Sequence, residues 1–273
     1  MSKRLAMGVD RSPVESGYRT MSPHIGWHRQ FREIVWPHSL LYLTLARLGV
    51  TPKIPQEYFG RGFDLCIAGY PRSGNTYAVN LVHHTQKRRM RIASHSHCPP
   101  LIKYLVANGV PSCLLIREPQ DAAISWAICQ ACTLDEALEF YVLFHRLLWP
   151  LRDRMVVARF EITIFKLGKV FETLNERFEM DLNCAFDQGA LDRQIFDSLE
   201  KADRLMEKTE AMIARPSEFR KLMKRRLERE SARSSTRALM DRAQRLYERF
   251  AELSVGKGLP EPSCAGNFGM NSV

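Results

Sequence analysis

Two periods of apolar and polar residues alternate along the middle of the chain, from Asp64 onward. Short runs rich in Val, Ile and Leu predict strands, and longer runs with apolar residues three and four apart predict helices. The predicted strands are 64–70, 90–94, 112–117 and 155–164, and the predicted helices are 75–86, 100–108, 121–131 and 165–178. Because strands and helices alternate at this spacing, we expect a three-layer α/β fold with a central parallel sheet.

Local signals mark helices in the second half of the chain. Thr133-Leu-Asp-Glu136 has the spacing of a capping box that opens a helix, and Pro150 ends it. The stretch 192–253 has a helical pattern throughout. Within it, one helical face is predicted to carry the apolar residues Phe219, Leu222, Met223 and Leu227, with basic residues around it.

The predicted organisation is one α/β domain over 63–255, preceded by an extension over 1–62 and followed by a flexible tail over 256–273. Residues 1–20 contain no apolar core of a signal peptide, so we expect a cytoplasmic protein. The apolar patch 39–50 is far shorter than the roughly 20 residues that span a bilayer, so it predicts a short helix packed on the core. Peripheral contact with a membrane and the oligomeric state stay open.

Composition narrows the classes of function without choosing one. With 273 residues, of which 45% are hydrophobic, the chain can bury the core of a single domain. A net charge of +10 suits an anionic ligand, a nucleic acid or an acidic membrane. We expect no nucleic-acid partner, because the basic residues are not interleaved with aromatic ones in a recognisable module. Seven cysteines, an odd number, favour a reducing compartment.

The segment from Asp64 to Val82 has the pattern of a phosphate-binding loop. An apolar strand passes through a turn bounded by Gly69 and Gly74 into a helix, whose first N–H groups would face the turn. The spacing approaches GxxxxGK[ST], but Asn75 stands where the lysine of that motif would be. A cation stands instead within the turn, as Arg72, and a planar guanidinium binds phosphate or sulfate oxygens in pairs.

The string YPRSGNTY, from Tyr70 to Tyr77, resembles the phosphosulfate loop YPKSGTTW of cytosolic-type sulfotransferases. This resemblance implies binding of the sulfuryl donor 3′-phosphoadenosine 5′-phosphosulfate (PAPS). The residues it assigns to the donor are Arg72, Ser73, Gly74, Asn75, Thr76 and Tyr77. Arg72 would also be catalytic, since it would stabilise charge on the departing phosphate.

Two further segments resemble the same family and follow in the same order. Ser96-His97-Cys98-Pro99 is similar to Thr-His-Leu-Pro, whose histidine is the general base. The segment from Arg117 to Ser125 is similar to RNPxDxxxS, whose arginine and serine hold the 3′-phosphate. Late in the chain, Arg220-Lys221 resembles the start of an RKG segment that also contacts this phosphate, with Leu222 in place of the glycine.

The resemblance implies transfer of a sulfuryl group from PAPS to a hydroxyl acceptor by in-line displacement, with no metal. The acceptor class stays open among small molecules, lipids and glycans. His95 and His97 fall on the same side of an extended segment, so only the resemblance favours His97. Apolar residues could line an acceptor pocket, although their helical spacing makes core packing the default; these are Trp126, Phe140, Tyr141 and Trp149.

Two other classes of protein fit parts of the sequence. The residues from Cys66 to Ser73 match the CxxGxxR[ST] spacing of cysteine phosphatases, in which a thiolate attacks phosphorus and Arg72 would bind the oxyanion. That hypothesis leaves the segment from Arg117 to Ser125 without a role. The second alternative is a nucleotide-binding protein of the same fold that performs no turnover.

Overall fold

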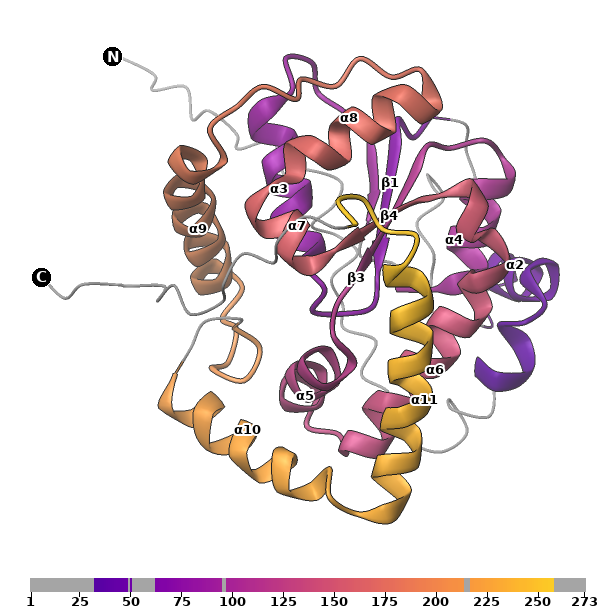
Figure 1. The fold of residues 1–273 in the computed structure, drawn as a ribbon, viewed down its shortest axis with the longest axis vertical. Coiled ribbons are helices and arrows are strands. Elements are labelled where there is room, and N and C mark those ends of the chain that lie inside the picture. The colour runs from indigo at the N-terminus through magenta and orange to yellow at the C-terminus, as the bar shows by residue number, and fades with distance from the viewer. Residues whose placement is uncertain (1–31, 49, 51–61, 95–96, 214–216, 258–273) are drawn as a thin grey trace, which may run out of the picture.

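The computed structural model describes residues 32–48, 50, 62–94, 97–213 and 217–257 (Figure 1). Its centre is a four-stranded sheet in the order β2-β1-β3-β4, in which every pair of neighbours is parallel. The strands are β1 Leu65–Gly69, β2 Ile92–Ser94, β3 Ser112–Ile116 and β4 Val156–Arg159. The predicted α/β class with a central parallel sheet is confirmed.

Helices cover both faces of the sheet and make the fold three-layered (Figure 1). One face packs against α2 Ser39–Arg47, α4 Pro99–Ala107, α5 Pro119–Gln130, α6 Leu134–Leu148 and α11 Ser234–Ala251. The other packs against α3 Asn75–Thr85, α7 Phe160–Phe165, α8 Leu167–Phe178 and α9 Gln188–Leu205. The 3-10 helix η3 Trp149–Arg154 follows α6, and α10 Glu218–Glu230 lies along α5. None of the described helices is long and apolar enough to cross a membrane.

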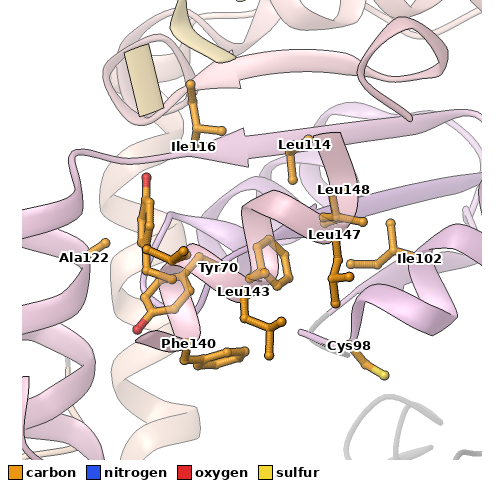
Figure 2. Close-up of a cluster of buried hydrophobic side chains, with 14 of the residues drawn as sticks. Tyr70, Cys98, Ile102, Leu114, Ile116, Ala122, Phe140, Leu143, Leu147 and Leu148 are labelled. Carbon is orange, nitrogen blue, oxygen red and sulfur yellow. The ribbon is translucent and has the colours of Figure 1, made fainter. Parts of the chain in front are cut away.

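The central strand β1 is buried along its whole length because it has a layer of helices on each side. Alternate side chains enter the two apolar clusters, with Cys66 on one side and Ile67 on the other. Just past the strand, the ring of Tyr70 packs 5.1 Å from that of Phe140 (Figure 2), and its hydroxyl donates to the carbonyl of Ala137 (2.9 Å). The residue that opens the predicted loop is therefore fixed to α6.

The aromatic residues considered for an acceptor pocket belong to this same cluster. Phe140 and Tyr141 are buried, and Trp126 and Trp149 pack against the cluster while partly buried. Core packing, the default expectation, accounts for all of them.

The capping box that opens α6 is confirmed. Thr133 Oγ1 accepts from the Glu136 N–H (3.2 Å), and the Glu136 carboxylate accepts from the Thr133 N–H (2.9 Å). The helix ends at Leu148, and Pro150 lies within η3. Two turn signals in the sequence thus fixed both ends of the helix that anchors Tyr70.

The predicted strand over 155–164 is wrong in its second half. β4 ends at Arg159, which pairs with Ile116, and the chain then turns into α7. The β-branched residues there favour a strand intrinsically, but in the fold the Gln188 amide, from a distant segment, donates to the carbonyls of Thr163 (3.1 Å) and Ile164 (2.5 Å). The turn brings Phe160 to the carboxyl edge of the sheet.

The predicted apolar face of the late helix is only partly correct. In α10, Leu227 is buried and Met223 packs partly against the core, whereas Phe219 and Leu222 are exposed. Among the described elements, α5 makes the main contact with α10, and Leu227 is the residue of α10 that is buried.

The parallel register gathers three loops at one edge of the sheet. Gly69 pairs with Leu115, and Ile116 pairs with Arg159, so β1, β3 and β4 end side by side. The turn after Gly69, the residue Arg117 and the start of α7 are therefore neighbours. Ligands of open α/β sheets bind in the crevice beyond these carboxyl ends.

Stability at acid pH offers a test of the core around α6. His145 is fully buried, and its Nδ1–H donates to the carbonyl of Tyr141 (2.9 Å), while its Nε2 has no hydrogen-bond partner. Burial lowers the pKa of the ring to about 4. The unfolded chain binds this proton near pH 6.5, so the stability His145 contributes is present above pH 6.5 and is lost as the pH falls toward 4. We expect His145→Phe to flatten the fall in the free energy of unfolding over this window, by up to about 3 kcal/mol. Denaturant titrations from pH 7 to 4 measure it, and parallel curves for the two proteins would contradict it.

Candidate functional site

A tight turn between β1 and α3 forms the centre of the candidate site. The N–H of Ser73 donates to the carbonyl of Tyr70 (3.2 Å), and Arg72 has a φ of 69°. Proline second and a positive φ third are the features of a type II turn, where glycine is the usual third residue. A non-glycine residue held in this region signals a position constrained by its surroundings, often at a functional site.

Glycines close both ends of the loop, for reasons of packing and backbone geometry. Gly74, with a φ of 89°, is the N-cap of α3. A Cβ at Gly69 would lie 2.7 Å from Asn75 Oδ1 and 2.8 Å from the carbonyl of Leu115. The first N–H groups of α3 consequently open into the turn, in the arrangement that binds anions at helix N-termini.

Three arginines from distant parts of the chain converge beside this turn. The hydroxyl of Ser125, on α5, accepts from Arg72 Nε (3.1 Å) and from Arg220 Nη2 (3.0 Å), the latter on α10. Arg117, just past β3, donates through Nη1 to the carbonyl of Arg72 (2.9 Å), and its guanidinium lies 4.3 Å from the ring centre of Phe160. Four of the predicted donor-binding residues thus form one connected group.

This arginine cluster, defined as Arg72, Arg117 and Arg220, concentrates positive charge, with Asp203, Asp121 and Glu161 as the acidic residues that act on it from nearby. Burial lowers the pKa of each guanidinium, and repulsion from neighbouring guanidiniums lowers the pKa of Arg117 and Arg220 further. Across the described ranges, none of the three forms an ion pair with a carboxylate. Concentrating buried cations without direct ion pairs is costly, and an anionic ligand would relieve that cost.

Main-chain carbonyls from the segment after α9 accept two further N–H donors of the cluster. Arg72 Nη1 donates to Met212 (3.1 Å), and Arg220 Nη1 donates to Ala211 (2.7 Å). Carbonyl oxygens carry only partial charge, so they bind a guanidinium more weakly than phosphate or sulfate oxygens do. These two contacts show where Nη1 of Arg72 and Nη1 of Arg220 could donate to the oxygen atoms of a ligand instead.

Two buried polar atoms in the turn lack hydrogen-bond partners. They are Ser73 Oγ, on a fully buried residue, and Asn75 Oδ1; the Asn75 amide nitrogen meanwhile donates to the carbonyl of Tyr70 (3.2 Å). Unsatisfied buried groups are rare in proteins and require a reason. A ligand oxygen in the turn would give the Ser73 hydroxyl its partner.

His97 lies at the opening of α4, with its ring directed to the end of β1. Its Nδ1 is 2.8 Å from the carbonyl of Gly69, and its φ is 42°. Since a carbonyl only accepts, Nδ1 carries the proton and Nε2 holds the lone pair of the neutral ring. Part of the side chain meets solvent, yet the surrounding protein lowers its pKa to about 4, so the ring is neutral at pH 7. His95 lies outside the described residues.

Two predicted donor-binding residues, Lys221 and Tyr77, bind other partners, whereas Thr76 lies directly after the turn. Lys221 is exposed and pairs with Glu218 (2.7 Å), one residue further along α10 than the arginine that faces the cluster. Tyr77 is buried, and its hydroxyl donates to Asp192 and accepts from Gln188 (2.9 Å), which joins α3 to α9. Thr76 is exposed on the first turn of α3.

Sequence reasoning missed several residues of the site. Phe160 stacks on Arg117 and would lie 3.4 Å from a Cβ at Gly74, and Cys129 is close enough to affect the charge of Arg72 and Arg220. The spacing of four between Ser125 and Cys129 on a helix could have placed this thiol on the same face. The local pattern does not indicate Phe160, because the residues 155–164 have the composition of a continuous strand.

The alternative nucleophile Cys66 has an unsuitable environment. It lies inside β1, with three further strand residues before the turn, and burial raises the pKa of its thiol to about 12. A thiolate nucleophile requires a lowered pKa and access to the substrate. The phosphatase spacing in the sequence therefore has no matching geometry.

Comparisons with known proteins give no relative. No protein-family model, no curated protein and no solved structure matches this chain. The function has to be inferred from the geometry and chemistry of the site itself.

Proposed function

We propose that the protein transfers a sulfuryl group from PAPS to a hydroxyl acceptor, in the cytoplasm. The observation that carries the proposal is the convergence of Arg72, Arg117 and Arg220 around Ser125, directly beside a strand-turn-helix loop. Such a loop binds one phosphate-type group, and the arginine cluster offers a second place for anionic charge. PAPS carries two such groups, the 5′-phosphosulfate and the 3′-phosphate.

The residues present fit this donor. The 5′-phosphosulfate would lie in the turn, where it would accept from the first N–H groups of α3 and would give the buried, unpartnered Ser73 hydroxyl an oxygen to bind. Arg117, Ser125 and Arg220 would hold the 3′-phosphate, and Arg72 lies between the two positions because it contacts Ser125 while belonging to the turn. The absence of a lysine at position 75 fits a ligand other than a nucleoside triphosphate.

The chemistry follows from the same placement. His97 takes the proton of the acceptor hydroxyl at Nε2 as the acceptor oxygen forms its bond to sulfur, and the bond between sulfur and the 5′-phosphate oxygen breaks. Arg72 stabilises the negative charge that develops on that departing oxygen. The Gly69 carbonyl keeps the proton of His97 on Nδ1 and so leaves Nε2 ready to accept.

The test of the activity uses the full chain with labelled PAPS and a fractionated metabolite, lipid and glycan extract. We expect a labelled product and, by calorimetry, binding of 3′-phosphoadenosine 5′-phosphate. Binding of this nucleotide with no product from any fraction would identify a nucleotide-binding protein without turnover. Absence of both would overturn the proposal.

Binding of the donor nucleotide should depend on Arg220 but not on its neighbour Lys221. Arg220→Ala should weaken binding of 3′-phosphoadenosine 5′-phosphate roughly 10- to 100-fold, since a charge-assisted contact contributes about 1.5–3 kcal/mol. Arg117→Ala should act similarly, and binding of 5′-AMP, which lacks the 3′-phosphate, should change far less in both variants. Lys221→Ala is the matched control, because Lys221 faces solvent, and it should bind both nucleotides like the parent. Calorimetry measures all three, and equal losses for both nucleotides would remove the 3′-phosphate from the assignment.

A substitution at Cys66 distinguishes sulfuryl transfer from thiolate chemistry. Cys66→Ser should leave turnover within about twofold of the parent, because the buried cysteine acts as a small apolar residue. A small loss of stability is expected from the buried hydroxyl. Steady-state kinetics together with thermal unfolding separate the two effects. Complete loss of turnover with unchanged stability would favour the phosphatase mechanism.

A further inference from the structure

The outward face of α10 combines exposed apolar side chains with arginines. Phe219 is 40% exposed and Leu222 66%, and Arg225, Arg226 and Arg229 are exposed beside them. The 3.6-residue repeat places Leu222, Arg225 and Arg229 on the side of the helix opposite Leu227, which is buried, and Phe219 and Arg226 along one border of that side. The outward face, defined by these five residues, has no covering element in the described part of the chain.

Cations dominate this helix even after its ion pairs are counted. Lys221 pairs with Glu218 (2.7 Å), and Arg226 lies 3.6 Å from Glu230. Arg225 and Arg229 make no salt bridge to any carboxylate in the ranges that the structure describes. The outward face consequently presents unneutralised positive charge around its apolar side chains.

Apolar side chains are also exposed where α9 ends and the following segment begins. Leu205 is 85% exposed and Met206 42%. This segment reaches α10 through the hydrogen bond from Arg220 to Ala211, and Figure 1 shows it next to the start of that helix. Apolar and cationic groups therefore share one region of the surface rather than being scattered singly.

We propose that the outward face of α10 docks onto an anionic lipid bilayer. Helices that lie in the plane of a membrane surface insert Phe and Leu among the acyl chains while Lys and Arg contact the phosphates of the headgroups. A nucleic acid would neutralise the arginines but would leave Phe219 and Leu222 without an apolar partner, and an acidic protein would need an apolar groove matched to this helix, which a bilayer does not. Complementarity in both charge and polarity thus favours a lipid surface.

The docking face lies on the same helix as part of the anion site. Arg220 projects to Ser125 from the inner side of α10, so a bilayer bound at the outer side would lie close to the arginine cluster. A hydroxyl acceptor held at a membrane surface would then be near the site. The docking itself does not rest on sulfuryl transfer, because it is measured by binding alone.

The test is sedimentation of the full-length protein with vesicles of phosphatidylcholine, with and without 30% phosphatidylserine. We expect binding to the anionic vesicles that weakens at high salt. Replacing Arg225, Arg226 and Arg229 together by Gln should lower the partition coefficient roughly 100-fold, at about fivefold for each arginine. Phe219→Gln with Leu222→Gln should lower it at least tenfold, since two apolar insertions are lost.

Matched variants keep the test specific. Gln at Arg237, Arg242 and Arg245 removes the same charge from exposed positions of α11, and should leave binding within about threefold of the parent. An equal loss in this triple variant would show that net charge alone binds the vesicles and would overturn the assignment to α10. Loss in Leu40→Gln, on the exposed side of α2, without loss in the α10 variants would move the docking face there. Failure to bind any vesicle, with binding to heparin instead, would replace the lipid by an acidic macromolecule.

Discussion

His97→Ala should lower turnover roughly 100-fold or more while leaving donor affinity nearly unchanged, as expected for loss of general-base assistance. The histidine is held by the Gly69 carbonyl at the end of β1, and that bond directs Nε2, rather than Nδ1, to accept a proton. Removing the ring leaves the turn and the arginine cluster in place. Steady-state kinetics with an accepted hydroxyl substrate measure turnover, and calorimetry with 3′-phosphoadenosine 5′-phosphate measures donor affinity.

The pH profile provides a second readout of the same residue. Because the pKa of His97 is lowered to about 4, the base is neutral, and able to accept a proton, throughout the range above that value. Turnover should therefore be insensitive to this group from pH 8 to 5 and should fall as the pH drops through about 4. His95→Ala is the control and should be mild. A large loss in His95→Ala with little loss in His97→Ala would transfer the role of base to His95.

The sequence predicted the sheet well because its strands are buried on both sides. A short continuous apolar run such as Leu65–Gly69 has few other stable environments, and the parallel arrangement follows from the helices between the strands. The error over 155–164 has the opposite origin: Phe160–Phe165 is rich in residues that favour a strand, but it is helical in the fold, where the Gln188 amide donates to the carbonyls of Thr163 and Ile164. No local pattern contains that distant partner.

The residues of the candidate site likewise fall into those that the sequence indicates and those that only the fold brings together. Motif spacing indicated Arg72, Arg117 and Ser125. Only the fold shows that Arg72 and Arg220 both donate to the Ser125 hydroxyl, because Arg220 is 95 positions further along the chain than Ser125. Helical geometry also separates Arg220 from Lys221, which a linear match treats as a pair. The positive φ of Arg72 could not be foreseen either, since the third position of such a turn favours glycine.

Arg72→Ala should reduce turnover roughly 100-fold or more, and Arg72→Lys should reduce it less, because lysine keeps the charge and stands at this position in the loop YPKSGTTW that the segment resembles. The planar guanidinium donates through Nε to Ser125 and through Nη1 in a second direction, toward the carbonyl of Met212. A lysine keeps the charge but cannot hold both directions at once, so charge developing on the departing oxygen would meet a poorly placed donor. Single-turnover kinetics at saturating donor measure this loss directly, because they separate the chemical step from binding.

Arg88→Lys is the matched control for this substitution. Arg88 is largely exposed and pairs with Asp64 (2.9 Å) at the opposite, amino end of the sheet, so turnover should stay at the parent's level. Equal turnover for Arg72→Lys and the parent would show that a positive charge at position 72 suffices for turnover and that the two donor directions of the guanidinium have no role. A loss at Arg72 would fit either sulfuryl transfer or a thiolate phosphatase, since both need a cation on the oxyanion. Cys66→Ser then decides between them, because only the phosphatase needs that sulfur.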